Sequence, residues 1–465
     1  MRKILLIILP IIASSNLIFA QMPHNLSNTD KVYGLSKFWQ EVNYNFIYFN
    51  KVDKNKWNEE YKNLISEVQK TTNDFEYYRL LQKYCATLKD GHTNVYFPKE
   101  IDKQLTYTEF GDYKFTLSNI EGKAIISQIN FNKKDELPVG TELLTINNYS
   151  TGSFITKFVE PYISSSTDYV RKNTAIEKLL YAPFETKFKL EFRLPDGKTK
   201  TLNLTTKKFK DKKMYPSVTN NSLLNFNWKQ KRIAYISFNT FDNPKIIEQF
   251  KEKLPELHKA ESLIIDLRNN DGGSTVIGLE ILKYLVNDTI LYGSRSESRM
   301  YVPTFKAWGD YLSPQDTING KQDWGMSKQE TIKYYLFANN EGYYKFEYTP
   351  DTINRRAERV VIPTVILIGN KTASAAEDFL IYTDNQKHMI KIGEPTNGST
   401  GQPIFFELPG GGTARICTKK DTYPDGREFI GYGIQPDILV SKTLSDFMEN
   451  KDPVLEKALR FLEDK

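Results

Sequence analysis

The stretch VILIGNKTASAAE, residues 365–377, has the pattern of a buried strand that turns into a helix. Its first four residues form a short apolar run rich in β-branched side chains, which is typical of a strand inside a sheet. A polar break follows at 370–372, and apolar positions at Ala376, Phe379 and Leu380 then recur with helical spacing. The sequence therefore predicts that Ser374 lies where a strand turns into a helix.

A serine at such a turn has chemical value. The first amides of a helix have no partner within it, and the helix dipole favours negative charge there. A serine oxygen that attacks a carbonyl generates an oxyanion, which needs such donors. Ser374 is therefore a candidate nucleophile. The alternative is that Ser374 or Thr372 only caps the helix.

A second strand-turn-helix unit lies upstream, in the stretch SLIIDLRNNDGG at 262–273. Ser274 or Thr275 is a candidate cap for the helix that follows. The paired glycines Gly272 and Gly273 allow a backbone to approach a ligand closely and to present amides to it. A plain tight turn is the alternative.

Three ordered motifs carry a family resemblance, DLRNNDGG at 266–273, TASAAE at 372–377 and GEPT at 393–396, and it extends to GIQPD at 433–437. Together they closely resemble the tail-specific, or C-terminal processing, serine peptidases. The resemblance implies an α/β catalytic core of crotonase-like β-β-α repeats and no cofactor. It also implies an acyl-enzyme on Ser374, with oxyanion donors from the Ala375 amide and from the turn of Gly272 and Gly273.

The general base is where the chain departs from this family. In the processing peptidases a lysine after the Gly-Glu-x-Thr motif takes the serine proton, and here Ser399 holds that position most simply. The segment DGHT at 90–93 instead resembles the branch that includes the tricorn protease core and interphotoreceptor retinoid-binding protein. In proteolytic members of that branch such a histidine is the general base, which implies this role for His92. An imidazole of ordinary pKa predicts falling activity below about pH 6.5.

The third member of the catalytic group cannot be carried over from that branch. Its glutamate before the Gly-x-Gly-Ile-x-Pro-Asp segment is replaced by Ile430, and its serine before the histidine by Gly91. Glu377 lies one helical turn after the candidate nucleophile and is the acid that we expect there. Asp90 and Glu428 are further candidates.

The remaining patterns divide the chain. Aromatic residues at helical spacing indicate an N-terminal helical domain, and alternating strands indicate a β-rich module. Its segment GTELLTIN at 140–147 looks like a PDZ domain, which would add a peptide strand to a sheet edge; a purely structural β-domain is the alternative. An aromatic-rich insert either shapes a substrate pocket or only packs. The expected boundaries are 21–100 for the helical domain, 101–210 for the PDZ-like domain, 211–445 for the peptidase core with its insert at about 287–358, and 446–465 for a C-terminal helix.

Composition limits the functional class. The chain has 465 residues, of which 40% are hydrophobic and 26% charged, as in a soluble globular protein. Its formal charge of +6 is spread thinly, without a basic stripe, so nucleic acid is not an expected partner. The four histidines show no metal-ligand spacing. Cys85 and Cys417 either form one disulfide or remain two buried thiols.

The N-terminus has the pattern of a secretory signal peptide over residues 1–20. Arg2 and Lys3 precede an apolar run, and Ala20 offers a small residue at the cleavage point. This predicts a periplasmic or secreted protein without an integral membrane segment after cleavage; an uncleaved anchor is the alternative. The expected partner is a polypeptide substrate, and recognition of its C-terminus is one hypothesis. The rival hypothesis is a non-catalytic binder of peptides or small apolar ligands on the same scaffold.

Overall fold

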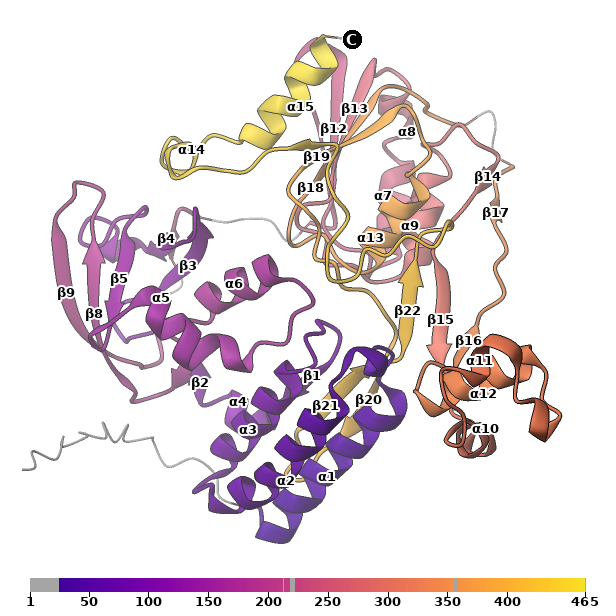
Figure 1. Cartoon of the computed structure of the whole chain (residues 1–465). Coiled ribbons are helices and arrows are strands. Elements are labelled where there is room, and N and C mark those ends of the chain that lie inside the picture. Colours follow the sequence, from indigo (N-terminus) through magenta and orange to yellow (C-terminus); the bar gives the residue numbers. More distant parts are fainter. Residues whose placement is uncertain (1–24, 212, 218–221, 355–357, 465) are drawn as a thin grey trace, which may run out of the picture.

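The computed structural model describes residues 25–211, 213–217, 222–354 and 358–464, so the expected signal peptide at 1–20 lies outside the described residues. Figure 1 shows a helical region, a β-rich region and an α/β core around a common centre, with a small helical arm at the side. Within the described ranges no helix combines the length and the apolar character that crossing a membrane requires.

Three helices form the N-terminal region: α1 (Asn28–Asn45), α2 (Lys54–Lys70) and α3 (Asp74–Ala86). Each begins after a capping residue whose side chain accepts a hydrogen bond from a backbone N–H of the first turn. These capping residues are Ser27, Asp53 and Asn73 respectively. The aromatic residues form its core, as in the stacking of Trp57 on Tyr84 with ring centroids 3.8 Å apart. The packing of these aromatics explains their helical spacing in the sequence.

The β-rich region has its own sheet and its own hydrophobic core. The main strand order is β10-β4-β5-β8-β9, with β3 on β4 and β6 on β5. The turn at Asp196 and Gly197 joins β8 to β9. The elements are β2 (Leu105–Thr106), β3 (Phe115–Ile120), β4 (Lys123–Asn130), β5 (Glu142–Ile146), β6 (Tyr149–Ser150), α5 (Thr151–Phe154), α6 (Asp168–Glu177), β7 (Ala182–Pro183), β8 (Lys187–Arg193), β9 (Thr199–Thr205) and β10 (Met214–Tyr215).

The core is a six-stranded sheet in the order β11-β12-β13-β18-β19-β23, in which β11 is antiparallel and the others are parallel. Helices cover both faces, as Figure 1 shows. The elements are β11 (Leu224–Trp228), β12 (Ile233–Phe238), α7 (Lys245–Lys251), α8 (Leu254–Leu257), β13 (Ser262–Asp266), α9 (Thr275–Leu282), β18 (Thr364–Ile368), α13 (Ala375–Tyr382), β19 (Met389–Gly393), β23 (Ile438–Leu439), α14 (Leu444–Met448) and α15 (Pro453–Glu463).

Strand β18 is buried on both faces. Val365 and Leu367 pack in the cluster that contains α15, whereas Ile366 and Ile368 pack in the cluster that contains α9 and α13. A continuous apolar run suits a strand buried on both sides. The helical stretch at 244–259 is divided into two short helices, α7 and α8, because Pro255 lacks an N–H and stands in the first turn of α8 instead of continuing α7.

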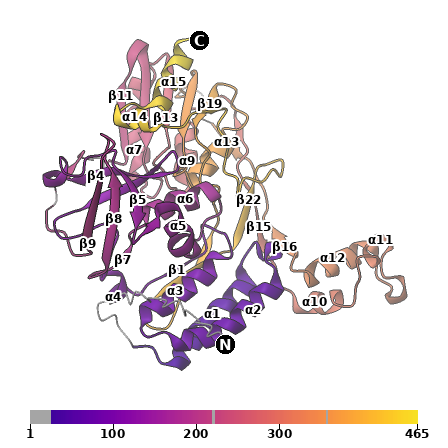
Figure 2. The same ribbon diagram turned by 60° about the vertical axis from the view of Figure 1, so that its left-hand side comes forward.

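The insert between β13 and β18 forms a separate arm. Its helices α10 (Pro303–Gly309), α11 (Asp316–Asn319) and α12 (Lys328–Ala338) project from the rest of the molecule at the far end of β15 and β16 (Figure 2). Its aromatic side chains pack on one another, as in the contact of Phe305 with Tyr334, whose ring centroids are 5.0 Å apart. These contacts favour packing over a substrate pocket for the insert. Its strands are β14 (Ile290–Leu291), β15 (Arg295–Arg299), β16 (Tyr343–Lys345) and β17 (Asp351–Thr352).

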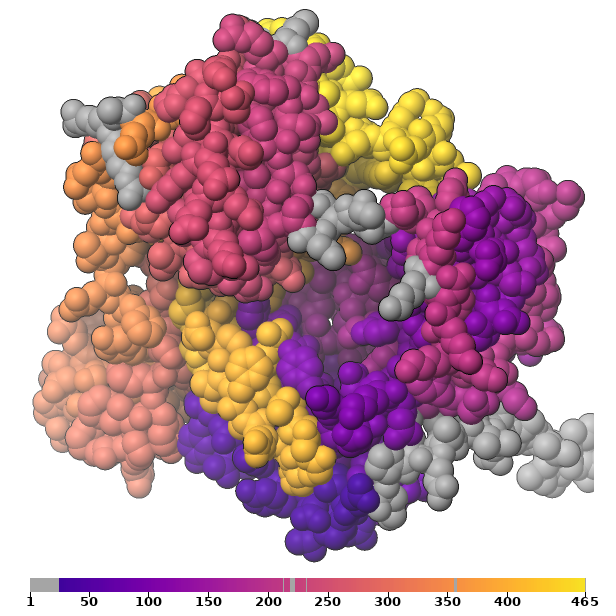
Figure 3. Space-filling view, turned by 180° about the vertical axis from the view of Figure 1, so that it is seen from behind, coloured from indigo at the N-terminus to yellow at the C-terminus, as the bar shows by residue number. Residues whose placement is uncertain are grey.

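A three-stranded sheet brings the helical region to the core. Strand β1 (Asn94–Tyr96), which follows the helical region and precedes α4 (Lys99–Asp102), pairs with β21 (Thr413–Cys417), and β21 pairs with β20 (Pro403–Glu407). Strand β22 (Lys419–Thr422) then returns to the arm. Figure 3 shows the hairpin of β20 and β21 from behind, next to a hollow that the core and the β-rich region also border. This pairing carries residues 90–93 to the edge of the core.

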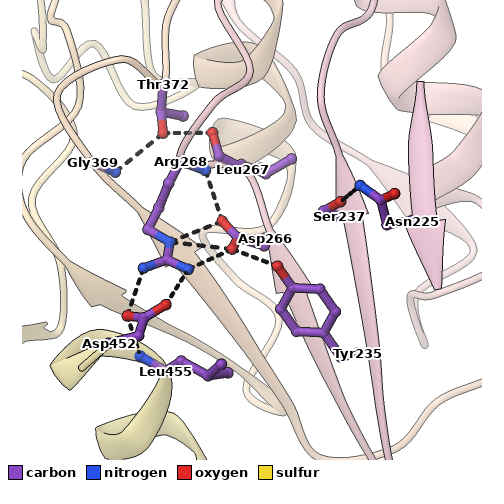
Figure 4. Close-up of polar contacts among 10 residues, drawn as sticks. All are labelled: Asn225, Tyr235, Ser237, Asp266, Leu267, Arg268, Gly369, Thr372, Asp452 and Leu455. Carbon is purple, nitrogen blue, oxygen red and sulfur yellow. Dashed lines mark hydrogen bonds and ion pairs between the residues drawn. The ribbon is translucent and has the colours of Figure 1, made fainter. Parts of the chain in front are cut away.

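A charged cluster fixes the C-terminal helix to the end of β13 (Figure 4). Arg268 donates to Asp266 at 2.6 Å and to Asp452, at the start of α15, at 2.8 Å. We expect Arg268→Ala to lower the free energy of unfolding by about 2–4 kcal/mol, because the buried Asp266 loses its partner. Urea denaturation measures this. Arg232→Ala, which removes an exposed pair with Glu261, should cost less than about 1 kcal/mol, and an equal loss in both variants would contradict the account.

Candidate active site

Ser374 follows β18 and occupies the N-cap position of α13, as the sequence predicts. Its backbone has φ 55° and ψ −123°, a conformation that a residue with a Cβ seldom adopts. The nucleophile of a sharp strand-to-helix turn is strained in this way, which exposes its hydroxyl. Thr372 does not cap α13: its hydroxyl donates to the Leu267 carbonyl at 2.8 Å and accepts from the Gly369 N–H at 3.1 Å (Figure 4).

The glycine turn after β13 lies directly against Ser374. Gly272 has φ 109°, and a Cβ there would lie 2.7 Å from the Cβ of Ser374 and 3.1 Å from the Ala375 nitrogen. Gly273 has φ 129°, and a Cβ there would lie 2.2 Å from the backbone of Phe241. Both positions therefore require glycine. Two turns that are about a hundred residues apart in the sequence meet at the candidate nucleophile because β13 and β18 are parallel neighbours.

The backbone amides around Ser374 differ in what they bind. The Gly272 N–H donates to Asn270 Oδ1 at 3.0 Å, so it already has an acceptor. Among the hydrogen bonds of the described residues, the N–H groups of Gly273 and Ala375 have no acceptor. An unpaired amide at the start of a helix suits a developing negative charge. Of the three expected oxyanion donors, these two have a free N–H in this structure.

Glu377 is fully buried behind Ser374 and holds the neighbouring loop. It accepts four hydrogen bonds, from the Thr396 hydroxyl and from the N–H groups of Ser374, Gly398 and Ser399, the last three at 2.7–3.2 Å. Burial raises the pKa of Glu377 to about 8, although all four donors favour the carboxylate. None of its hydrogen bonds goes to His92. Glu377 therefore positions the candidate nucleophile and residues 396–399, and it does not orient the imidazole.

Ser399 links the two candidate catalytic residues. Its Oγ lies 2.7 Å from His92 Nδ1, and its carbonyl accepts the Ser374 N–H at 3.3 Å. Within the described part of the chain, no hydrogen bond joins Ser374 and His92 directly. The sequence placed Ser399 where a lysine is expected but did not reveal its contact with the imidazole, because 307 residues separate the two. The only sign of this role in the sequence was a serine at the position where the processing peptidases have a lysine.

The environment of His92 keeps the imidazole neutral. Burial, with the positive charges of Arg415 and Lys419, lowers the pKa of His92 to about 4. The neutral ring has one N–H and one lone pair, and a hydrogen bond at Nδ1 decides which nitrogen carries the proton. If Nδ1–H donates to Ser399, Nε2 presents the lone pair. At neutral pH the imidazole is then able to accept a proton.

The other candidate acids do not contact the imidazole. Asp90 is buried and accepts a hydrogen bond from the Thr93 hydroxyl at 2.6 Å, so it fixes the turn that carries His92. Glu428 pairs with Lys420 and Lys51. The serine that the related branch has before its histidine is absent, and a Cβ on Gly91 would lie 2.7 Å from Ser399 Oγ. Ser399 thus occupies the space that a larger residue at position 91 would need.

The lysines near the core are paired. Lys419 lies 3.0 Å from the buried Asp421, and the carboxylates of Asp421 and Asp378 raise its pKa despite burial. It therefore stays protonated at neutral pH, whereas a base must be neutral. Lys371 is exposed and pairs with Glu177, and Lys391 pairs with Asp437. Cys85 and Cys417 are two separate buried thiols, so the disulfide alternative is not observed.

The close approach of Gly272 to Ser374 gives a prediction. We expect Gly272→Ala to lower kcat/KM by about a hundredfold or more, because the added methyl displaces the nucleophile and the Ala375 amide. Gly197→Ala is the control, since Gly197 also has a positive φ, of 86°, but a Cβ there meets no atom within 4 Å. Initial rates on one peptide measure both variants. Equal losses would mean that backbone strain, and not proximity to Ser374, sets the effect.

Comparison with known proteins fits this site. Residues 232–440 match the family model "Peptidase family S41". A carboxyl-terminal-processing protease of Synechocystis is 26% identical over 228 residues, which cover 48% of this chain and 41% of that protein. The chain thus spans less than half of this curated relative.

Solved structures show the same fold over most of the chain. Mature CPAF complexed with lactacystin has a TM-score of 0.66 at 14% identity, covering 94% of this chain and 99% of that one. A candidate peptidase of Parabacteroides merdae has a TM-score of 0.52 at 17% identity, covering 94% and 97%. The matched residues 232–440 include β13, β18, the glycine turn and Ser374, and they identify this part of the chain as a domain of peptidase family S41.

Proposed function

We propose that the chain is an exported serine endopeptidase that hydrolyses polypeptides through an acyl-enzyme on Ser374, with His92 as the general base. The observation that carries the proposal is the arrangement around Ser399. This residue contacts His92 through its hydroxyl and Ser374 through its carbonyl, next to a strained nucleophile turn with two unpaired amides. Family membership supports peptide hydrolysis, whereas the base, the donors and the export are our assignments.

In the proposed reaction, the His92 Nδ1–H donates to Ser399 and Nε2 accepts the proton of the Ser374 hydroxyl. The serine oxygen attacks the scissile carbonyl. The resulting oxyanion accepts hydrogen bonds from the N–H groups of Ala375 and Gly273. The imidazolium then protonates the leaving amine, and a water molecule hydrolyses the acyl-enzyme by the same route. Glu377 keeps the turn and residues 396–399 in place.

The substrate class follows from the relatives and from the β-rich region. The Synechocystis relative is named for carboxyl-terminal processing, and we propose that this chain likewise cleaves polypeptides near their C-termini. The PDZ-like region would hold an extended segment at a sheet edge. Export to the periplasm or the medium is inferred from residues 1–20.

Cleavage of an unfolded polypeptide tests the function. We expect reduced and alkylated casein to be cut into fragments. Mass spectrometry would show that the summed mass of two complementary fragments exceeds the mass of their parent by one water. Lys371→Ala, which removes an exposed side chain, should cleave at the parental rate. An intact substrate after prolonged incubation, with a melting temperature that shows a folded protein, would favour the non-catalytic binder.

A further inference from the structure

A short segment of the β-rich region, the stretch SSSTDY at 164–169, lies against the candidate active site. It leads into α6, which lies on the side of the β-rich region that faces the core (Figures 1 and 2). Five of its six residues carry a hydroxyl group, and each hydroxyl takes part in a hydrogen bond. We call residues 164–169 the bridging segment, because these bonds reach the two loops that carry His92 and Ser399.

The bridging segment holds the turn before His92 through Ser166. The Gly91 N–H donates to Ser166 Oγ at 3.0 Å, and the Ser166 hydroxyl in turn donates to Asp90 Oδ1 at 3.4 Å. A Cβ on Gly91 would lie 2.7 Å from Ser399 Oγ and 3.6 Å from Ser166 Oγ, so the absence of a side chain there allows both serines to approach the turn. Ser166 therefore fixes the backbone from which the imidazole projects.

The same segment holds the loop that carries Ser399. The Thr167 hydroxyl donates to the Asn397 carbonyl at 3.2 Å, and the Tyr169 hydroxyl donates to the Thr396 carbonyl. Burial raises the pKa of Tyr169 to about 12, so its hydroxyl keeps the proton and remains a donor at neutral pH. The two carbonyls precede Ser399 by two and three residues in the chain, so these bonds restrict where its hydroxyl lies.

A third contact of the same helix reaches the turn of the candidate nucleophile. Asn173 on α6 donates to Asn370 Oδ1 at 2.9 Å, and Asn370 lies between β18 and Ser374. Asn173 also accepts from Asn119 on β3 at 2.6 Å, and Ile176 anchors α6 in the core of the β-rich region. The support for all three loops is therefore itself held by a packed sheet.

We propose that Ser166 and Tyr169 are positioning residues of the peptidase, which keep the His92 imidazole in contact with Ser399. This inference rests on the proposed function, because it assigns both residues to the action of His92 as the base. The two partners of that contact are 307 residues apart in the chain, so both of their loops need a common support. Among the hydrogen bonds of the described residues, neither hydroxyl reaches the imidazole, so both residues act through the loops.

Kinetics of single and double variants test the positioning role. We expect Tyr169→Phe and Ser166→Ala each to lower kcat by about tenfold and to leave KM within about twofold, because each removes one hydrogen bond away from the substrate. In the Ser399→Ala background each should lower kcat by less than about threefold, because the contact that they support is already absent. A role in folding alone would give the same loss in both backgrounds, and that result would overturn the proposal.

Heteronuclear NMR with isotope-labelled histidine gives a measurement that does not depend on cleavage. The signal of His92 Nδ1 is assigned by its absence from His92→Ala. We expect this signal to move in both variants, because its hydrogen bond with Ser399 is lengthened or lost. Tyr33→Phe and Ser445→Ala are the matched controls, because both residues are exposed and lie on α1 and α14. An unmoved signal in both variants, with parental melting temperatures, would overturn the proposal.

The positioning role and the peptidase activity fail separately. If the parent cleaves its substrate and both variants keep its kcat and its His92 signal, the positioning role is wrong and the function stands. If the signal moves in both variants but the parent cleaves nothing, the proposed function is wrong and the bridging segment still holds the imidazole.

Discussion

Replacement of Ser374 by alanine is expected to lower the peptidase rate by about six powers of ten without unfolding the protein. The hydroxyl is the only group in the proposed mechanism that forms the acyl-enzyme, so its loss removes the covalent route. The fold should persist, because the turn is held by contacts of the Ser374 backbone with Glu377 and Ser399. These contacts do not use the side-chain oxygen.

The comparison is between initial cleavage rates of one peptide by the parent, by Ser374→Ala and by Ser445→Ala. Ser445 is an exposed serine on α14, and its loss should leave the rate unchanged within a factor of two. Equal melting temperatures would show that all three proteins are folded. Turnover by Ser374→Ala at the parental rate would reject the nucleophile.

Replacement of His92 by alanine is expected to lower the rate by about three to four powers of ten, because the nucleophile and its base act as a unit. Ser399→Ala should cost only about tenfold, since it removes one neutral hydrogen bond to Nδ1 and leaves the base in place. His258→Ala, at an exposed position, serves as the control. Near-parental rates in His92→Ala would reject the histidine mechanism.

The pH profile carries a second signature of His92. A base works in its neutral form, so its activity falls as pH drops through its pKa. Because burial lowers the pKa of His92 to about 4, we expect kcat/KM to stay level from pH 7 to about pH 5 and to halve near pH 4. The sequence alone predicts this limb near pH 6.5. A limb at pH 6.5 in the folded protein would contradict the buried environment of the imidazole.

The sequence was sufficient to predict the strand-to-helix turn that carries Ser374 and the glycine turn beside it. Apolar runs at 262–267 and 365–368 predict strands that are buried on both faces. The glycines and the serine that follow them predict two turns. Parallel strands place such turns at one edge of a sheet, so Gly272 and Ser374 were predictable neighbours. The local pattern contains this information because strand, turn and helix are adjacent in the chain.

The sequence was not sufficient to predict how His92 is held. The contact of His92 with Ser399 depends on the pairing of β1 with β21, which spans more than 300 residues and leaves no periodic signal. Glu377 has the helical spacing of an orienting acid, yet its four acceptor bonds face the loop at 396–399. Burial determines both the low pKa of His92 and the role of Glu377, and burial is a property of the assembled fold.

The most direct test of the central claim is labelling of the native protein with a fluorophosphonate, which reacts with an activated serine. The account predicts a single covalent adduct on the peptide that contains Ser374, formed quickly by the parent and far more slowly by His92→Ala. Absence of the adduct in the folded parent, or an adduct on another serine, would contradict the claim that Ser374 is an activated nucleophile.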